Sequence, residues 1–150
     1  MSEVRPLTQF SVFLVNKPGV LAQVTTALAQ EKINLLAVTL VDSQEHGVLR
    51  LVAEDAAAAR AVLTKLNLPM TETDVLCVDL PNRPGALADV ATVLGKEHIN
   101  INYAYVTSGA PGGRTTGVFK VADQAKAVHV LKKPATKHKE PDLHRTGGRR

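Results

Sequence analysis

NKPGVLA at residues 16–22 and NRPGALA at residues 82–88 are two copies of one motif, and the rest of the chain is organised around them. Each copy follows a short apolar run, and an Ile-Asn pair comes eighteen residues after its asparagine, at residues 33–34 and 99–100. At an offset of 66 residues, identities recur without a gap from Leu14/Leu80 to Asn34/Asn100. Repeats of this kind indicate repeated structural units. We infer that the chain is a duplication.

The bulk composition is that of an ordinary globular protein. The 150 residues are 45% hydrophobic and 21% charged, close to the average for folded domains. A single repeat of 66 residues would bury only about 60% of its unfolded surface, against roughly 70% for the whole chain. We therefore expect the two copies to pack together. The single cysteine, Cys77, excludes an internal disulfide and a cysteine-based zinc site, and we expect neither a metal nor a cofactor.

The positive charge is concentrated at the end of the sequence. Residues 132–150 carry a net charge of +5, whereas residues 1–131 carry −1. A general nucleic-acid surface is therefore not expected. The sequence contains no apolar run of eighteen residues and no charged-then-apolar leader, which favours a cytoplasmic location and no membrane partner.

Each copy predicts the order strand, helix, strand, strand, helix. The run FSVFLV at residues 10–15 has the β-branched and aromatic composition of a strand. The asparagine and proline that follow suit a helix start, and the apolar spacing over residues 20–32 predicts a helix. The other expected elements of the first copy are strands 33–41 and 47–53 and a helix ending near residue 66. In the second copy we expect a strand at 76–80, a helix at 86–97, strands at 99–107 and 116–121, and a helix at 123–133.

The connection between the copies predicts a shared strand. Only fifteen residues separate Leu66 from Asn82, so one continuous strand, Met70–Leu80, has to close the first unit and open the second. The second unit lacks a closing strand of its own, and by the repeat offset we expect Val4–Thr8 to supply it. The predicted organisation is a first unit at residues 1–72, a second at 73–133, and a basic, disordered tail at 134–150.

The motif has the chemistry of a small anion-binding corner. A strand that leads directly into a helix leaves the first helical N–H groups unpaired, at the positive end of the helix dipole. Gly19 and Gly85 permit close approach of a ligand. Asn16 and Asn82 add carboxamides that can donate and accept hydrogen bonds. Such a corner could hold the carboxylate and ammonium groups of a free amino acid, although a plain capped turn would have the same sequence.

Other classes of function are less well supported. The five histidines are scattered without metal-ligand spacing, and we find no catalytic constellation, so we do not expect an enzyme. An acylphosphatase-like enzyme would need an arginine in an anion loop, for which Arg83 is the candidate. An RNA-binding protein using the basic tail would need sheet aromatics for base stacking; the candidates are Phe13, Tyr103, Tyr105 and Phe119. Both alternatives remain open.

The two motifs, their spacing and the element order resemble the ACT domain family, over about residues 8–133. The resemblance implies an α+β fold of two ferredoxin-like βαββαβ units packed side by side, with helices on one face of antiparallel sheets. It also implies that the loop of one unit and the second strand of the other hold a small effector between them. The ligand-binding residues implied in this way are Asn16, Gly19, Val20 and Leu21 with Asn100, and Asn82, Gly85, Ala86 and Leu87 with Asn34.

The resemblance also implies a regulatory function. Small proteins made of two ACT units are the most similar in organisation, and they suggest an amino-acid sensor with a free amino acid as its ligand. A homodimer and a partner enzyme of amino-acid metabolism are further expectations from the family. Some effector-binding members carry a histidine two residues before the loop asparagine, where this chain has Leu14 and Leu80.

Overall fold

The computed structural model describes residues 3–42, 46–107 and 113–132. Both copies contain the predicted order of strand, helix, strand, strand and helix. The predicted tail at residues 134–150 lies outside the described residues. The first copy contains β1 (Val4–Val15), α1 (Val20–Gln30), β2 (Leu35–Asp42), β3 (His46–Ala53) and α2 (Ala56–Lys65). The second contains β4 (Met70–Pro81), α3 (Ala86–Lys96), β5 (Ile101–Thr107), β6 (Arg114–Val121) and α4 (Gln124–Lys132).

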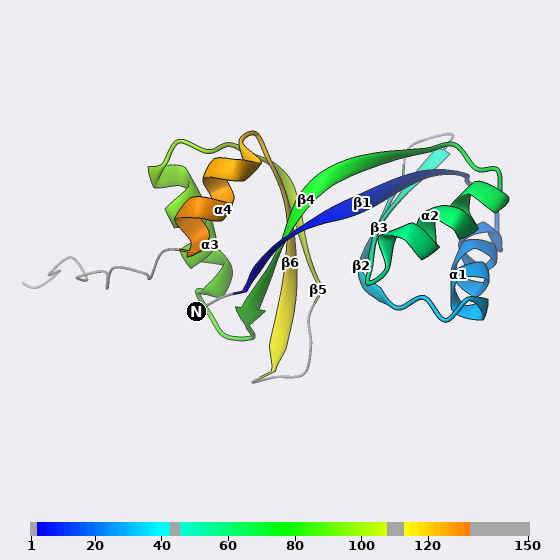
Figure 1. Ribbon diagram of the computed structural model, residues 1–150, viewed down its shortest axis with the longest axis horizontal. Coiled ribbons are helices and arrows are strands. Elements are labelled where there is room, and N and C mark those ends of the chain that lie inside the picture. Colours follow the sequence, from blue (N-terminus) through cyan, green and yellow to red (C-terminus); the bar gives the residue numbers. More distant parts are fainter. Residues whose placement is uncertain (1–2, 43–45, 108–112, 133–150) are drawn as a thin grey trace, which may run out of the picture.

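The two units share their central strands. The six strands form one antiparallel sheet in the order β2-β3-β1-β4-β6-β5. β1 and β4 pair from Val4↔Val78 to Val12↔Met70, so each of these long strands begins in one unit and ends in the other (Figure 1). The predicted strand over residues 70–80 is confirmed, and so is the prediction that Val4–Thr8 closes the second unit. Pro6 is tolerated because β3 joins β1 only from Phe10 onward, which leaves Pro6 in an edge segment.

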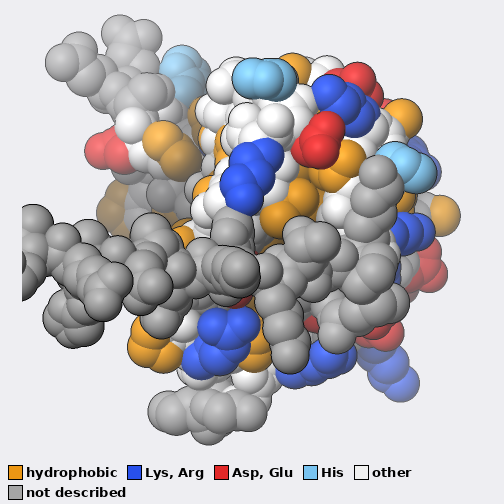
Figure 2. Space-filling model, turned by 90° about the vertical axis from the view of Figure 1, so that its left-hand side faces the viewer, with side chains coloured by type: hydrophobic (Ala, Val, Ile, Leu, Met, Phe, Trp, Pro, Cys, Tyr) orange, Lys and Arg blue, Asp and Glu red, His pale blue; other side chains and the backbone are white. Residues whose placement is uncertain are grey.

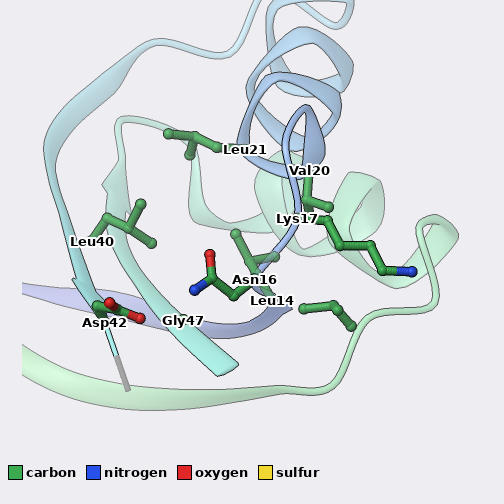
Figure 3. Close-up of a pocket in the computed structure, with 9 residues that line it drawn as sticks. Leu14, Asn16, Lys17, Val20, Leu21, Leu40, Asp42 and Gly47 are labelled. Atoms are coloured by element: carbon green, nitrogen blue, oxygen red, sulfur yellow. The ribbon is translucent and has the colours of Figure 1, made fainter. Parts of the chain in front are cut away.

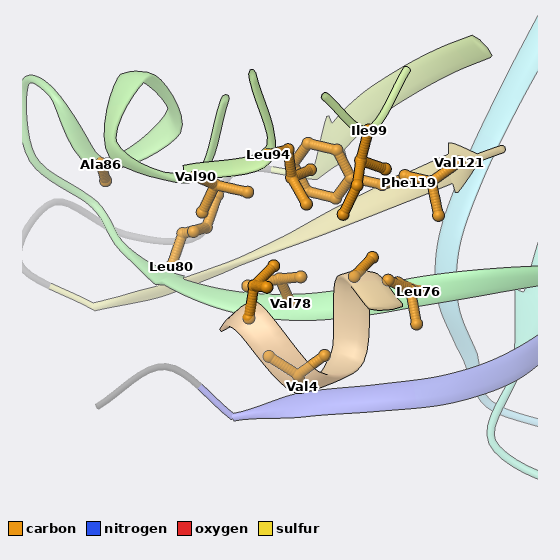
Figure 4. Packing of buried hydrophobic residues seen from close by; sticks show 12 residues of the cluster. Val4, Leu76, Val78, Leu80, Ala86, Val90, Leu94, Ile99, Phe119 and Val121 are labelled. Atoms are coloured by element: carbon orange, nitrogen blue, oxygen red, sulfur yellow. The ribbon is translucent and has the colours of Figure 1, made fainter. Parts of the chain in front are cut away.

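Each pair of helices covers one face of its half of the sheet (Figure 1). α1 and α2 cover a core that includes Phe10, Leu28 and Leu51, each at most 1% exposed. α3 and α4 cover the second core, in which Val4 of β1 lies near Val78 of β4 (Figure 4). The predicted α+β fold of two ferredoxin-like units is therefore confirmed, and the N-terminal strand contributes to the core of the opposite unit.

The faces of the two half-sheets that no helix covers share a third, smaller cluster of buried hydrophobic residues. It contains side chains from both units, with Tyr105 of β5 packed against it; its buried members are Ala37, Val52, Val75, Cys77 and Val118. At its margin, Gln9 is fully buried. The Gln9 carboxamide donates to the Tyr103 hydroxyl at 2.7 Å and accepts from the Tyr105 hydroxyl at 2.8 Å. Buried polar groups need hydrogen-bond partners, and both partners of Gln9 belong to the second unit. This polar network therefore joins the two units.

No helix within the described residues is long and apolar enough to cross a lipid bilayer.

Candidate functional site

Both predicted corners have the same unusual backbone. β1 ends at Val15, and α1 begins at Val20 after Gly19, whose φ is 87°. In the second unit Gly85 has a φ of 88° and immediately precedes α3. These φ values lie in the left-handed region, which glycine adopts without the steric cost that a Cβ imposes. The two glycines therefore direct the chain sharply from strand into helix at both corners.

The starts of α1 and α3 differ from those of the other helices. The Asp55 carboxylate accepts a hydrogen bond from the backbone N–H of Ala58 at 3.0 Å and caps α2. Asp123 accepts in the same way from Lys126 at the start of α4, also at 3.0 Å. Neither α1 nor α3 has a side-chain cap. The N–H groups of Val20 and Ala86 make long hydrogen bonds to the Lys17 and Arg83 carbonyls, at 3.5 and 3.4 Å. The N–H groups that follow them in the first turns are suited to an external anion, which the helix dipole also favours.

A cavity of about 280 Å³ lies beside the first corner. In Figure 3 the Asn16 carboxamide lies on the side of the pocket where Asp42 and Leu40 lie, whereas the Lys17 side chain extends away on the other side. The cavity is small for a drug-sized ligand, but it is large enough for an amino acid. Its lining residues are Leu14, Val15, Asn16, Lys17, Val20, Leu21, Leu40, Asp42 and Gly47.

All nine residues that line this cavity belong to the first unit. The reason is the way in which the units are joined. Because they share β1 and β4, the Asn16 corner lies beyond Val15, where β1 pairs only with β3. The pocket is therefore built between this corner and the ends of β2 and β3.

Asn34 and Asn100 lie at the opposite end of their units from the corners. The Asn34 carbonyl accepts from the Glu54 N–H at 2.9 Å, just after the end of β3, and the Asn100 carbonyl accepts from the Ala122 N–H at 3.0 Å, just after β6. The corners flank the other ends of these two strands. At about 3.3 Å per residue, the eight residues of β3 place the Asn34 and Asn16 ends of the first unit about 23 Å apart.

The two asparagines have other partners within the chain. The Asn34 Nδ2 donates to Glu54 Oε2 at 3.4 Å, and the Asn100 Nδ2 donates to Asn102 Oδ1 at 3.3 Å. The ladder between β6 and β4 ends at the pair Leu76↔Phe119, whereas β4 continues for six more residues to Met70, opposite Val12. Within one chain, the strand registers therefore do not place Asn100 beside the Asn16 corner.

The second corner carries the remaining predicted residues. Ala86 is buried, Leu87 is 46% exposed, and the backbone N–H of Asn82 donates to the Gly113 carbonyl at 3.0 Å. The Arg83 guanidinium is 3.2 Å from Asp89 Oδ2 in the first turn of α3. Arg83 therefore neutralises a neighbouring carboxylate, which does not favour the anion loop of an acylphosphatase-like enzyme.

Leu40, Asp42 and Gly47 line the pocket but were not among the predicted site residues. They come from the last residues of β2 and the start of β3, where Asp42 pairs with Gly47. The predicted strands 33–41 and 47–53 already placed these residues close together. The strand register that brings them to the Asn16 corner depends on tertiary pairing.

Three of the four candidate aromatics on the sheet are buried or already have partners, which does not favour a base-stacking platform; Phe13 alone of the four is exposed, at 38%. Phe119 is 1% exposed within the second core, and the hydroxyls of Tyr103 and Tyr105 are both bonded to Gln9. Figure 2 shows the end of the molecule that carries α3 and α4, where basic and acidic side chains are interspersed. No group of three or more potential metal-ligating side chains occurs among the described residues.

Comparison with known proteins identifies the family. The family model described as an ACT domain pair matches residues 5–143. Protein BT0572 from Bacteroides thetaiotaomicron has a similar structure, with a TM-score of 0.78 and 34% identity over 86% of this chain and 88% of that one. The curated proteins contain no significant match.

Two aspartate kinase structures share the fold at lower identity. The ligand-free regulatory subunit of aspartate kinase from Thermus thermophilus gives a TM-score of 0.66 and 16% identity, covering 87% of this chain and 93% of that one. Aspartokinase III of E. coli, in complex with lysine and aspartate, gives a TM-score of 0.53 and 19% identity, covering 87% of this chain and 31% of that one.

Proposed function

The chain belongs to the ACT domain family as a pair of ACT domains, and from this we propose that it is a non-catalytic regulatory protein that binds a free amino acid. The observation that carries the proposal is the cavity at the Asn16 corner, where the uncapped start of α1 meets a carboxamide and a carboxylate. The α-carboxylate of the ligand would accept hydrogen bonds from the first N–H groups of α1. The Asp42 carboxylate and the Asn16 oxygen would accept hydrogen bonds from its ammonium group.

The expected affinity is that of a sensor. Two or three charge-assisted hydrogen bonds contribute about 1.5–3 kcal/mol each. After the cost of association, this corresponds to roughly micromolar to millimolar binding. We place this function in the cytoplasm, where free amino acids are available as signals.

We further propose that two copies pair along β2. β2 is an outer strand of the sheet, and it exposes apolar side chains on both faces: Leu40 is 50% exposed on the helix face and Val41 is 46% exposed on the other. An apolar edge strand with unpaired backbone groups is a template for another strand. A second copy would cover both faces of this edge and bring its own β2, with Asn34 at its start, toward the open side of the pocket.

The proposed target is an enzyme of amino-acid metabolism. Solved structures with this fold include the regulatory subunit of aspartate kinase from Thermus thermophilus and the structure described as aspartokinase alpha and beta subunits. We propose that this ACT pair acts by contact with such an enzyme, in the manner that the name regulatory subunit describes.

A thermal-shift screen of the twenty amino acids tests the proposed function. A ligand that binds only the folded state raises the melting temperature, so at least one amino acid should do so. The double variant Asn16→Ala, Asn82→Ala should weaken its binding roughly ten- to a hundredfold, since a charge-assisted hydrogen bond is lost. An unchanged affinity in the double variant would contradict the proposal.

A further inference from the structure

We propose that the chain binds one amino acid with an aliphatic side chain, at the Asn16 corner, and that the Asn82 corner is not an equivalent site. This inference rests on the proposed function and names its ligand class and stoichiometry. The main observation behind it is that both corners have the same backbone conformation, whereas the side chains around them differ between the two units.

The charge at the two helix starts differs. The first turn of α1 contains no acidic residue, and Gln23 stands there at the position equivalent to Asp89 in the first turn of α3. The Asp89 carboxylate already occupies the positive end of α3 and is paired with Arg83 at 3.2 Å. The positive end of α3 and the Arg83 guanidinium therefore already have an anionic partner, so a carboxylate ligand would gain less at the second corner than at the first.

The space at the two corners also differs. Gly47 lines the pocket of the first unit, and a Cβ at this position would meet Leu40 Cδ1 at 3.4 Å. The position equivalent to Gly47 in the second unit is Thr115, which pairs with Leu80 and is 6% exposed. A buried side chain therefore stands in the second unit where the first unit has a glycine beside the cavity.

The two copies also differ in sequence at the position that offers a charged partner for an ammonium group. Asp42 lies at the end of β2, on the same side of the pocket as the Asn16 carboxamide (Figure 3). The residue equivalent to Asp42 in the second copy is Ser108, whose hydroxyl carries no charge. An uncharged hydroxyl would attract an ammonium group less strongly than the Asp42 carboxylate does.

The remaining lining of the pocket is aliphatic. Leu14 is 3% exposed, Leu21 is 38% exposed and Leu40 is 50% exposed, and Val20 and Val15 complete the apolar wall. The Lys17 ammonium extends away from this wall (Figure 3). A ligand whose side chain is a hydrocarbon would remove this wall from water, whereas a charged or hydroxylated side chain would lose hydration without a partner. The lining therefore selects a valine-, leucine- or isoleucine-like side chain.

Isothermal titration calorimetry of the full chain tests this inference. The probes are L-valine, L-leucine and L-isoleucine, compared with L-threonine, L-lysine and L-aspartate. We expect one bound ligand per chain, and an affinity at least tenfold higher for one aliphatic probe than for any of the polar probes. Asp42→Asn should weaken this binding about tenfold, because the charged acceptor for the ammonium group is removed.

The repeat supplies a matched control. Leu21→Ser should weaken aliphatic binding about tenfold, whereas Leu87→Ser, at the equivalent exposed position of the second unit, should change it less than twofold. Two equal sites per chain, equal losses in both variants, or tightest binding of a polar probe would overturn this inference and leave the proposed function standing. Failure of all twenty amino acids to bind would overturn the proposed function itself.

Discussion

The Gln9 Nε2 lies 2.7 Å from the Tyr103 hydroxyl, and this hydrogen bond joins side chains that are 94 positions apart in the sequence and belong to different units. Gln9 is fully buried, and its carboxamide oxygen accepts from Tyr105 at 2.8 Å. The Arg50 guanidinium lies 4.0 Å from the centre of the Tyr103 ring. These contacts do not repeat in the duplication, because the residue equivalent to Gln9 is Val75.

The first prediction concerns this network. Tyr103→Phe should lower the free energy of unfolding by about 1–3 kcal/mol, because the Gln9 amide is left buried without its acceptor. The midpoint of urea denaturation measures the change. The double variant Gln9→Leu, Tyr103→Phe should recover part of the loss. A double variant as unstable as the sum of the two single variants would show that the two side chains are not coupled.

The second prediction concerns the strand that β1 contributes to the opposite unit. Val4 is 5% exposed and belongs to the second core. Val4→Ala should destabilise the protein by roughly 1–3 kcal/mol, because a cavity forms beneath α3 and α4. Pro6→Ala, in the same segment but exposed, serves as the control in the same denaturation experiment. Equal effects of the two substitutions would contradict the assignment of Val4 to that core.

The third prediction concerns the corner glycines. Gly19→Ala should cost about 1–2 kcal/mol, because its φ of 87° is unfavourable for a residue with a Cβ. An added Cβ at Gly19 would meet no atom within 4 Å, so the cost is one of backbone conformation alone. Gly95→Ala is the matched control: it lies within α3, also meets nothing within 4 Å, and should gain about 0.5–1 kcal/mol. Destabilisation by both substitutions would argue against this explanation.

The fourth prediction concerns the proposed pairing of two copies along β2. Val38→Lys places a charge at a position that is 39% exposed on this edge, and it should shift the chain from dimer to monomer. Analytical ultracentrifugation measures the change. Ala104→Lys, at the equivalent position of β5, should leave the dimer intact. A wild-type chain that is monomeric at micromolar concentration would contradict the pairing.

The fifth prediction concerns alkaline pH. Burial raises the pKa of the Cys77 thiol from its usual value near 9 to about 11, and burial also raises the pKa of Tyr105. Above pH 9 the unfolded chain loses the thiol proton while the folded chain keeps it. Stability should therefore be retained below about pH 9 and should fall as the pH rises toward 11. Denaturation midpoints from pH 8 to 10.5 measure this slope, which should be shallower in Cys77→Ala. Equal slopes would refute the assignment.

The predictions from sequence succeeded where local chemistry and the repeat determine the structure. The two glycine corners, the helices that follow them and the continuous strand over Met70–Leu80 all depend on residues close together in the chain. The duplication also located Val4–Thr8 as the closing strand, because at an offset of 66 it is equivalent to Met70–Asp74, which closes the first unit. In the register of the sheet, Val4–Thr8 pairs with Asp74–Val78.

The side chains that surround the corners could not be predicted from the sequence. Asp42 and Gly47 reach the Asn16 corner through the register of β3 against β1, in which Val15 pairs with His46. Asn100 was expected beside Asn16, but it lies next to Ala122 at the far end of the second unit. Strand order and register depend on contacts between distant segments, which the spacing of residues along one segment does not encode.

Residue order alone was enough to establish a duplicated β-α corner with glycine at its bend, because backbone conformation and helix capping are decided within a few residues. Which strands the units share, and therefore which side chains face each corner, followed only from the folded chain. The pairing of β1 with β4 buries the apolar residues of both units at once, and that collective gain places the pocket within the first unit, beside Asp42.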